Sequence, residues 1–341
     1  MLLFGIESSC DETAAAIVED GVHEVASVLA TSAKLHELTG GVVPEVAARK
    51  QVEFIVPVIA ACLAKANVSP DKIDAIAVTV GPGLVGSLVV GVEAAKALAV
   101  AWNKPVIPVN HLVGHIYGNF VSGNASAIVF PAVVLIVSGG HTDLVLMRGH
   151  GDLEYIGGTV DDAAGEAFDK VARLLNISRY FGGAAISNLA ATCKNNTLQG
   201  KFPRPMLHDN TFDFSFSGLK TAVKNFVEQN PLADTAAVAR EFETAVVDVL
   251  VAKTIAAAKK YNAMSILLAG GVAANTPLRT RLNLDAQNIG IPVFVPPLRL
   301  CSDNAVYIAS AAFFTSDFHN TPRLLSEIKA NPSLGVMDRV Y

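Results

Sequence analysis

Cysteine is scarce in this 341-residue chain: Cys10, Cys62, Cys193 and Cys301 are far apart, and none belongs to a CxxC pair. Zinc ribbons and disulfide frameworks need closely spaced or paired cysteines, so the sequence argues against both. Reduced thiols in a cytoplasmic protein are the simplest interpretation. With 51% hydrophobic residues, the chain is long enough for two domains.

Positive charge is also limited. The formal net charge is −5 and the isoelectric point is about 5.9. This balance argues against a protein that coats nucleic acid non-specifically. It leaves open a local basic patch, or a basic partner that holds the nucleic acid.

The sequence lacks a long uninterrupted apolar run. The longest apolar stretch, residues 84–102, contains Glu93 and Lys96, and two charges near the middle of a membrane span are costly in lipid. A buried helix of a soluble core is favoured, so we expect no membrane partner. Residues 1–6 lack a basic start and end at Glu7, which predicts no signal peptide.

Two segments share one pattern. LLFGIESS, CDET and AAAIVED follow one another at the start, and AVVLIVSGG, HTD and LVLM follow about 130 residues later. Each is typical of an apolar strand, a polar turn and a second apolar strand, which is a hairpin. Two such hairpins indicate a duplicated architecture. The alternation of strands and helices elsewhere indicates an α/β protein with two sheets.

The rest of the chain predicts further elements. Pro44 suits the first turn of a helix, and Pro105 ends another. We expect residues 177–216, which are rich in Gly, Pro and Asn, to form an irregular segment. We expect helices over residues 44–63, up to 102, 111–120, 162–176, 232–261, from 277 and 303–314, and strands over 74–80, 106–109, 265–271 and 291–296.

The motif HLVGH contains two candidate metal ligands. At positions i and i+4, His111 and His115 share one helix face with Cβ atoms roughly 5–6 Å apart, which suits two ligands of one metal. Two ordinary helix histidines are the alternative. The peptidase motif HExxH carries its general base between the histidines, and no such residue is present here.

Asp303, in LCSDNA, is a candidate third ligand. It is equally a candidate N-cap of the last helix. Two histidines and one carboxylate leave open coordination positions and suit iron or zinc.

Three glycine-rich turns follow apolar strands: GPGLVG (81–86), VSGGHT (137–142) and AGGVAAN (269–275). Glycine lets backbone N–H groups approach a phosphate or ribose, although each could be only a tight turn. None is a P-loop, and none fits GxGxxG well. Three in one chain favour a nucleotide site, where Asn275 could bind a sugar or base.

Acidic residues gather in two places. Asp11 and Glu12 occupy the first turn, and Asp162, Glu166 and Asp169 follow Asp161 at spacings that share a helix face. Contacts to ribose hydroxyls, a metal or an amine are one interpretation. A solvated face or a helix-dipole effect is the other.

Basic residues are sparse, and four flank the FPRP and FSFSGLKT stretches with their phenylalanines: Lys201, Arg204, Lys220 and Lys224. Basic and aromatic side chains together could contact RNA. An ordinary surface over a core is the alternative.

The ordered motifs resemble one family over nearly the whole chain. They are GIESSCDET, GGVVPEVAAR, AVTVGPGLVGSL, NHLVGH, LIVSGGHTDL, DDAAGEAFDK, FPRPM, DFSFSGLKT, AGGVAAN and SDNA. In this order they look like the TsaD family, the tRNA N6-adenosine threonylcarbamoyltransferases once classed as O-sialoglycoprotein endopeptidases.

The resemblance implies an actin-like fold of the hexokinase and Hsp70 superfamily, with two α/β lobes and a nucleotide site in the cleft. Lobe 1 would comprise residues 1–130 and about 300–341 and carry the metal. Lobe 2 would comprise residues 131–300 and carry the nucleotide-binding motifs. The chain would move the threonylcarbamoyl group from threonylcarbamoyl-AMP to the exocyclic amine of the adenosine 3′ of the anticodon. The acceptors would be tRNAs reading codons that begin with A, and AMP would be released.

The resemblance also implies residue roles. His111, His115 and Asp303 would hold one divalent metal, Fe²⁺ or alternatively Zn²⁺, and Asp11 and Glu12 would be catalytic. Contacts to the adenylate would come from Ile136, Val137, Ser138, Gly139, Gly140, Asp169, Gly183 and Asn275.

The chain departs from the family pattern in one stretch. YFGGAA (180–185) stands where YPGGP is common, with Phe181 and Ala184 in place of prolines. Gly182 is therefore an alternative to Gly183. Ser187 stands where many relatives have an acidic residue.

Two rival functions share the expected fold. A small-molecule kinase would use the glycine turns but leave HLVGH without a role. A non-catalytic scaffold subunit is the other rival, and scaffolds related to the family lack the metal histidines. The net charge of −5 suits a lone tRNA-binding enzyme poorly. The resemblance accordingly implies two bacterial partners, a paralogous actin-like subunit and a small ATPase.

Overall fold

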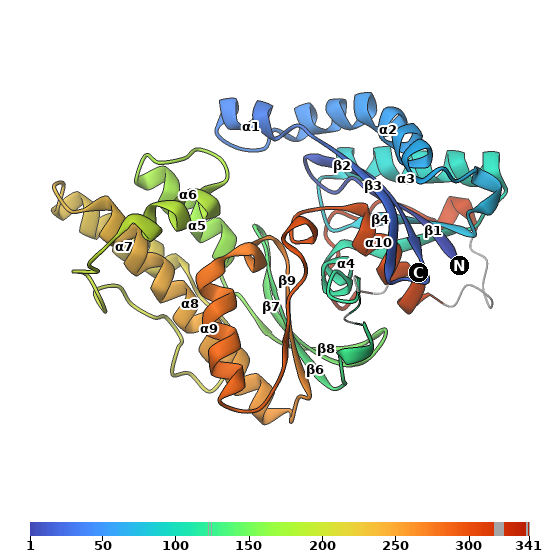
Figure 1. Cartoon of the computed structure of the whole chain (residues 1–341). Coiled ribbons are helices and arrows are strands. Elements are labelled where there is room, and N and C mark those ends of the chain that lie inside the picture. Colours follow the sequence, from blue (N-terminus) through green and yellow to red (C-terminus); the bar gives the residue numbers. More distant parts are fainter. Residues whose placement is uncertain (122, 124, 317–323, 339, 341) are drawn as a thin grey trace. The chain divides into compact units, whose positions relative to one another are not determined.

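The computed structural model describes residues 1–121, 123, 125–316, 324–338 and 340. The chain forms two compact units. Unit 1 comprises Met1–Ile128 and Pro296–Tyr341, and unit 2 comprises Val129–Val295. Positions 122, 124, 317–323, 339 and 341, within the range expected for lobe 1, lie outside the described residues. Each unit carries one five-stranded sheet (Figure 1).

The sheet of unit 1 has the order β3-β2-β1-β4-β5. Its strands are β1 (Leu2–Glu7), β2 (Glu12–Glu19), β3 (His23–Thr31), β4 (Ala75–Gly81) and β5 (Val106–Asn110). β1, β2 and β3 are antiparallel neighbours, whereas β1, β4 and β5 run parallel. The predicted first hairpin is confirmed. The sequence did not predict β3, a largely exposed edge strand with mixed charged and apolar residues.

Helices cover both faces of this sheet. The helices of unit 1 are α1 (Ala33–Thr39), α2 (Pro44–Ala66), α3 (Val85–Trp102), α4 (His111–Tyr117) and α10 (Ala305–Thr315). Figure 1 shows α2 and α3 above the sheet and α4 and α10 below it. α10 packs against β1, β2 and α4, and its first eight residues are buried. One buried core joins β1 and β4 to α2 and α3, and α10 packs against the sheet without contributing a residue to that core.

α3 is the one helix in the described part of the chain that is long and apolar enough to cross a membrane. One face packs on β4 and α2, and 33% of its residues are buried. Val85, Val89 and Val100 lie on the outer side and are exposed. The helix expected to end at Trp102 is confirmed, but its burial is one-sided.

The sheet of unit 2 has the order β10-β9-β6-β7-β8. Its strands are β6 (Ala132–Val137), β7 (Thr142–Gly149), β8 (Asp152–Gly158), β9 (Ser265–Ala269) and β10 (Val293–Phe294). β6 and β7 pair antiparallel, which confirms the second hairpin, and β6, β9 and β10 run parallel. The strand expected over residues 291–296 is reduced to two residues.

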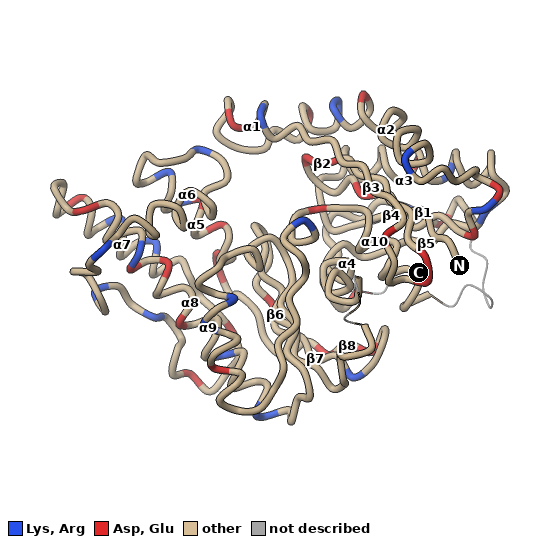
Figure 2. Tube along the Cα trace, in the orientation of Figure 1, with Lys and Arg blue, Asp and Glu red and all other residues tan. Residues whose placement is uncertain are grey.

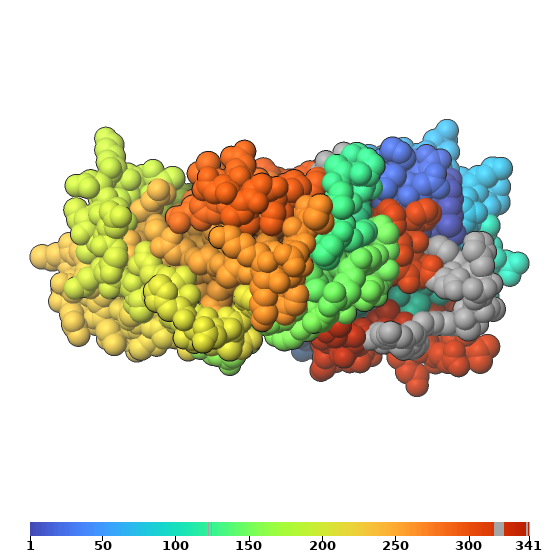
Figure 3. Space-filling model, turned by 90° about the horizontal axis from the view of Figure 1, so that it is seen from below, coloured from blue at the N-terminus to red at the C-terminus, as the bar shows by residue number. Residues whose placement is uncertain are grey.

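Five helices complete unit 2: α5 (Ala164–Leu174), α6 (Gly182–Thr192), α7 (Ser217–Gln229), α8 (Thr235–Lys260) and α9 (Thr276–Gln287). α8 packs on α6 and α9, and α8 and α9 appear gold and orange in Figure 3. Charges of both signs are scattered over α7, α8 and α9 (Figure 2), whereas the central strand β6 has none.

The irregular segment expected over residues 177–216 is partly wrong, because it contains α6. Ile186 and Ala190, four residues apart, are wholly buried, which is the spacing of one helix face. The adjacent glycines at the start of α6 indicate a loop, so this short pattern did not predict a helix. α7 was also not predicted.

Candidate functional site

α4 begins directly at the end of β5 and carries both histidines of HLVGH. The Asn110 side chain accepts a hydrogen bond from the Leu112 N–H at 3.0 Å and so caps the helix. His111 and His115 follow one turn apart, with ring centroids 4.6 Å from each other. Both are buried. The cap and the helical spacing place the two imidazoles together.

Asp303 does not cap α10, so that alternative is wrong. Asn304 is the cap, and its side chain accepts from two backbone N–H groups of the first turn at 3.0 and 3.2 Å. The Asp303 carboxylate faces the histidines instead. Its Oδ1 lies 3.5 Å from Nε2 of both His111 and His115, and the Tyr307 hydroxyl donates to it at 3.4 Å.

Gly114, inside HLVGH, lets α4 and α10 approach closely. A Cβ added there would lie 2.7 Å from Ile308 Cδ1 and 2.8 Å from Tyr307 Cδ2. Real side chains do not tolerate such contacts without movement. The small residue between the histidines therefore brings the helix that follows Asp303 within reach of them.

The three candidate ligand atoms of His111, His115 and Asp303 all lie within 4.8 Å of one another. Two imidazole nitrogens and one carboxylate oxygen suit a divalent iron or zinc ion. The residues present therefore fit a metal of the predicted kind.

Glu7, the last residue of β1, was not among the predicted site residues. It is fully buried, and its Oε2 lies 3.0 Å from His111 Nδ1. The signal in the sequence was a charged residue ending an apolar strand.

Burial and neighbouring charges shift the pKa values of the ionisable side chains in this group. Burial would lower the pKa of His111, but the charges of Glu7 and Asp303 raise it to about 9. Burial raises the pKa of Asp303 to about 6, although the positive charge of His111 acts to lower it. Burial, with the charges of Asp303 and Asp11, raises the pKa of Glu12 to about 10. Glu12, at the start of β2, and the buried Asp11 therefore belong to the same electrostatic neighbourhood.

In unit 2, the turn between β6 and β7 offers mainly backbone. The side chains of Ile136 and Val137 are wholly buried. The Ser138 N–H donates to the His141 carbonyl at 2.8 Å, and the His141 N–H donates to Ser138 Oγ at 3.2 Å. Gly139 and Gly140 between them are exposed, so this turn can present backbone N–H groups to a ligand.

Two other glycines let neighbouring elements close on this turn. A Cβ at Gly165, in the first turn of α5, would lie 2.4 Å from the Ser138 carbonyl oxygen. Gly270, after β9, has φ +89° and its Cβ would lie 2.4 Å from the Val137 carbonyl oxygen. Both positions require the absence of a side chain.

Asp169 is joined to the start of α6. The Gly182 N–H donates to Asp169 Oδ1 at 2.9 Å, and a Cβ at Gly182 would lie 2.5 Å from Asp169 Cα. Gly183 has open space at its Cβ position. Gly182 is therefore packed against Asp169 and leaves no space for a ligand atom at its Cα, whereas the space beside Gly183 is open.

Asn275 caps α9, because its Oδ1 accepts the Leu278 N–H at 2.8 Å. Its amide donates to Ser187 Oγ at 2.9 Å and to Glu243 Oε1 at 2.8 Å. Glu243, on α8, is buried and also accepts from Ser187 at 2.7 Å. Sequence reasoning missed Glu243, although an acidic residue amid apolar ones in a helix was a signal.

Several residues considered for ribose or RNA contacts pair internally instead. Asp162 bonds Lys170 at 2.8 Å and Lys220 at 2.9 Å. Arg204 bonds Glu241 at 2.6 Å. Three of the four phenylalanines in this region are core residues: Phe202, Phe214 and Phe216. The RNA interpretation of this stretch is therefore not supported by the packing.

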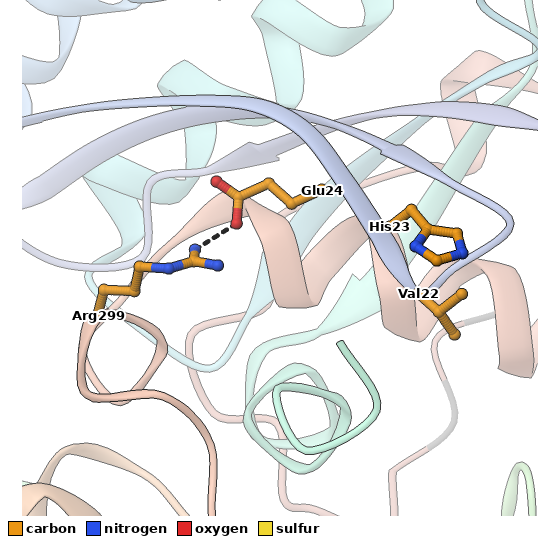
Figure 4. A pocket seen from close by; sticks show the side chains of 4 residues that line it. All are labelled: Val22, His23, Glu24 and Arg299. Carbon is orange, nitrogen blue, oxygen red and sulfur yellow. Dashed lines mark hydrogen bonds and ion pairs between the residues drawn. The ribbon is translucent and has the colours of Figure 1, made fainter. Parts of the chain in front are cut away.

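A surface depression in unit 1 is lined by Val22, His23, Glu24 and Arg299 (Figure 4). Arg299 forms an ion pair with Glu24 across it. The depression shares no residue with the metal group.

The TsaD family model, described as tRNA N6-adenosine threonylcarbamoyltransferase, matches residues 23–310. The chain belongs to the TsaD family. Curated relatives of that name include the Moorella thermoacetica protein, 50% identical over 316 residues, which cover 92% of this chain and 91% of the relative. The Bacillus subtilis protein is 48% identical and covers 98% of this chain and 95% of its own length. As a TsaD member the chain is a tRNA-modifying transferase, as the resemblance implied.

Solved structures confirm the actin-like fold. HypF of T. kodakarensis is 14% identical, with a TM-score of 0.61 over 91% of this chain and 46% of that one. Component A of the (R)-2-hydroxyglutaryl-CoA dehydratase of Acidaminococcus fermentans is 15% identical, with a TM-score of 0.52 over 92% and 98%. At such identities the likeness concerns the fold alone.

Proposed function

We propose that this TsaD member transfers the threonylcarbamoyl group from threonylcarbamoyl-AMP to the exocyclic amine of the adenosine 3′ of the anticodon. The acceptor tRNAs read codons that begin with A, and AMP is released. The observation that carries the proposal is the grouping of His111, His115 and Asp303 within 4.8 Å. A kinase or a scaffold would give this group no role.

The reaction needs help because an adenine amine is a poor nucleophile, with its lone pair delocalised into the ring. The carbamoyl–AMP anhydride supplies a good leaving group. The protein must then position the reactants and stabilise charge on the carbonyl and phosphate oxygens. A metal on His111, His115 and Asp303 would supply Lewis-acid chemistry when bound.

Asp11 and Glu12 are the proposed catalytic carboxyl groups. In the metal-free protein Glu12, with a pKa of about 10, holds its proton at neutral pH. A protonated carboxyl donates a hydrogen bond and cannot accept the proton of the amine. In this state Glu12 is suited to donate a hydrogen bond to developing negative charge.

The proposed adenylate contacts all belong to unit 2. Backbone N–H groups of Gly139 and Gly140 suit phosphate or carbonyl oxygens. The Ser138 N–H already bonds the His141 carbonyl, so Ser138 is proposed to contribute its hydroxyl, and the buried Ile136 and Val137 support the turn. Asp169, Gly183 and Asn275 are proposed for the nucleoside. Ser187 offers a hydroxyl tied to Glu243 where many family members have an acid.

We assign Fe²⁺ as the metal, with Zn²⁺ as the competing outcome, since both accept imidazole and carboxylate ligands. We also assign cytoplasmic action with a paralogous actin-like subunit and a small ATPase. The net charge of −5 and the internal pairing of Arg204 and Lys220 support partners that hold the tRNA. Exposed valines on α2 and α3, Val52, Val56 and Val85 among them, offer an apolar surface for a subunit.

The test is a reconstituted transfer assay. The purified chain is analysed for bound metal, then given threonylcarbamoyl-AMP and unmodified tRNA, with and without the two partner proteins. We expect modified adenosine and one AMP per modification, with turnover rising when the partners are added. No modified tRNA under any of these conditions would overturn the proposal. Full turnover by the chain alone would remove the partner requirement only.

A further inference from the structure

Glu7 is a buried carboxylate that the proposed chemistry does not use directly. Both of its oxygens are occupied. Oε1 accepts the Ser9 N–H at 2.5 Å, and Oε2 accepts the Thr79 hydroxyl at 2.6 Å and lies 3.0 Å from His111 Nδ1. The carboxylate thereby joins the end of β1, the following turn, β4 and α4. No lysine or arginine pairs with it among the described residues, and the His111 imidazole is the one basic side chain in an ion pair with it there.

The two nitrogens of His111 face different groups. Nδ1 faces Glu7, and Nε2 lies 3.5 Å from Asp303 Oδ1. A carboxylate can only accept hydrogen bonds, so Nδ1 must carry a proton to bond Glu7. In the neutral imidazole, the form that binds a metal, Nε2 is then the nitrogen whose lone pair lies on the side of Asp303 and His115.

We propose that Glu7 is a positioning residue of the metal group. It fixes the ring orientation and the tautomer of His111, so that Nε2 is the ligand atom, and its negative charge makes that nitrogen a stronger donor. The inference rests on the proposed function, because it assumes that His111, His115 and Asp303 hold a metal.

The length of the Glu7 side chain is part of the argument. Aspartate at this position would keep the charge but withdraw the carboxylate by about one methylene, roughly 1.5 Å. The 3.0 Å contact to Nδ1 would then be lost. Glutamine would keep the length but lose the charge, and its NH₂ group would face either the Ser9 N–H or the Thr79 hydroxyl and His111 Nδ1.

The experiment measures metal affinity rather than turnover. Wild type, Glu7→Gln and Glu7→Asp are titrated with Zn²⁺ against a chelator, and with Co²⁺ while its visible absorption is recorded. We expect both variants to bind Zn²⁺ about 10–100-fold more weakly and to show an altered Co²⁺ spectrum. The matched control is Glu53→Gln, because that carboxylate is 56% exposed. This control variant should bind Zn²⁺ as tightly as wild type and give the same Co²⁺ spectrum.

A second measurement needs no variant at Glu7. In Zn²⁺-loaded wild type, ¹⁵N NMR of the histidines should show His111 with a protonated Nδ1 and a metal-bound Nε2. Metal on Nδ1, or Glu7 variants that bind Zn²⁺ as tightly as wild type, would overturn the inference. Wild type that binds neither ion would instead refute the metal part of the proposed function, and the two failures are thus distinguishable.

Discussion

The two units build their candidate sites from different material. Unit 1 gathers ionisable side chains, with the buried Glu7, His111 and His115 and the half-buried Asp303 joined by polar contacts. Unit 2 offers backbone groups of the Ser138 turn, and close packing at glycines shapes it. The first kind of site depends on which functional groups are present. The second depends on which side chains are absent. Mutations should therefore damage the two units in different ways.

The largest effect is expected from His111→Ala. Loss of one imidazole should abolish stoichiometric metal binding and lower transfer by about 100-fold or more, because the remaining ligands no longer form the set. Binding of AMP by unit 2 should be unchanged. Metal analysis, the transfer assay and AMP titration check this, with His23→Ala as an exposed-histidine control. Full transfer by the variant would contradict a metal-dependent mechanism.

A smaller effect is expected in unit 2 from Gly165→Ala. The new Cβ would meet the Ser138 carbonyl oxygen at 2.4 Å, so the turn must shift. Overpacking of this kind costs about 1–3 kcal/mol, and AMP binding should weaken while metal content stays the same. Denaturant unfolding and AMP titration measure both.

The control for Gly165→Ala is Gly218→Ala in α7, whose Cβ would enter open space. It should stabilise by up to about 1 kcal/mol, since alanine favours helices. If both variants behaved alike, the backbone interpretation of unit 2 would be wrong.

Two substitutions of Asn275 separate its cap of α9 from the hydrogen bonds that its amide donates to Ser187 and Glu243. Asn275→Ala should cost about 1 kcal/mol through loss of the α9 cap, with an added cost because Glu243 loses a donor. Asn275→Asp keeps the cap oxygen but removes the amide. It should therefore still be less stable than wild type at pH 7. Equal stability of Asn275→Asp and wild type in thermal unfolding would mean that the cap is the whole contribution.

The smallest effect, on stability, is expected from substitution of Asp143 on β7. Burial raises its pKa to about 6, so the native state holds this proton more tightly than the unfolded chain. Stability therefore falls as pH rises from about 4 through 6. Asp143→Asn should be more stable than wild type by about 1 kcal/mol at pH 7, a modest value because the side chain is partly exposed. At pH 4 the two should match. An equal difference at both pH values, measured beside the exposed Asp152→Asn, would contradict the assigned cause.

Much of the fold could be predicted because its strands and longest helices have strong local patterns. The hairpins around CDET and HTD, α2 from Pro44, and α8 followed directly from apolar periodicity and helix-start residues. α6 could not be predicted, since only Ile186 and Ala190 mark its buried face and the adjacent glycines suggest a loop. β3 is a largely exposed edge strand, so tertiary pairing with β2 defines it more than its own pattern does.

The site residues show the same limit. The histidine pair of HLVGH is evident in the sequence. The sequence could not show whether Asp303 is a metal ligand or a helix cap, and the structure shows that Asn304 is the cap. Glu7 and Glu243 carry no motif, because their importance arises from contacts with residues far away in the chain. Local sequence shows which groups are available, whereas long-range packing determines which of them meet.

One consequence of the chain order concerns synthesis. The ribosome makes the two histidines about 190 residues before Asp303 and α10, and all of unit 2 lies between. At about 5–20 residues per second, that interval lasts about 10–40 s. During it, unit 2 is synthesised, while the sheet of unit 1 lacks the helix that packs on β1 and β2. The full ligand set exists only once the last segment has emerged, so a nascent chain cannot close its metal group early.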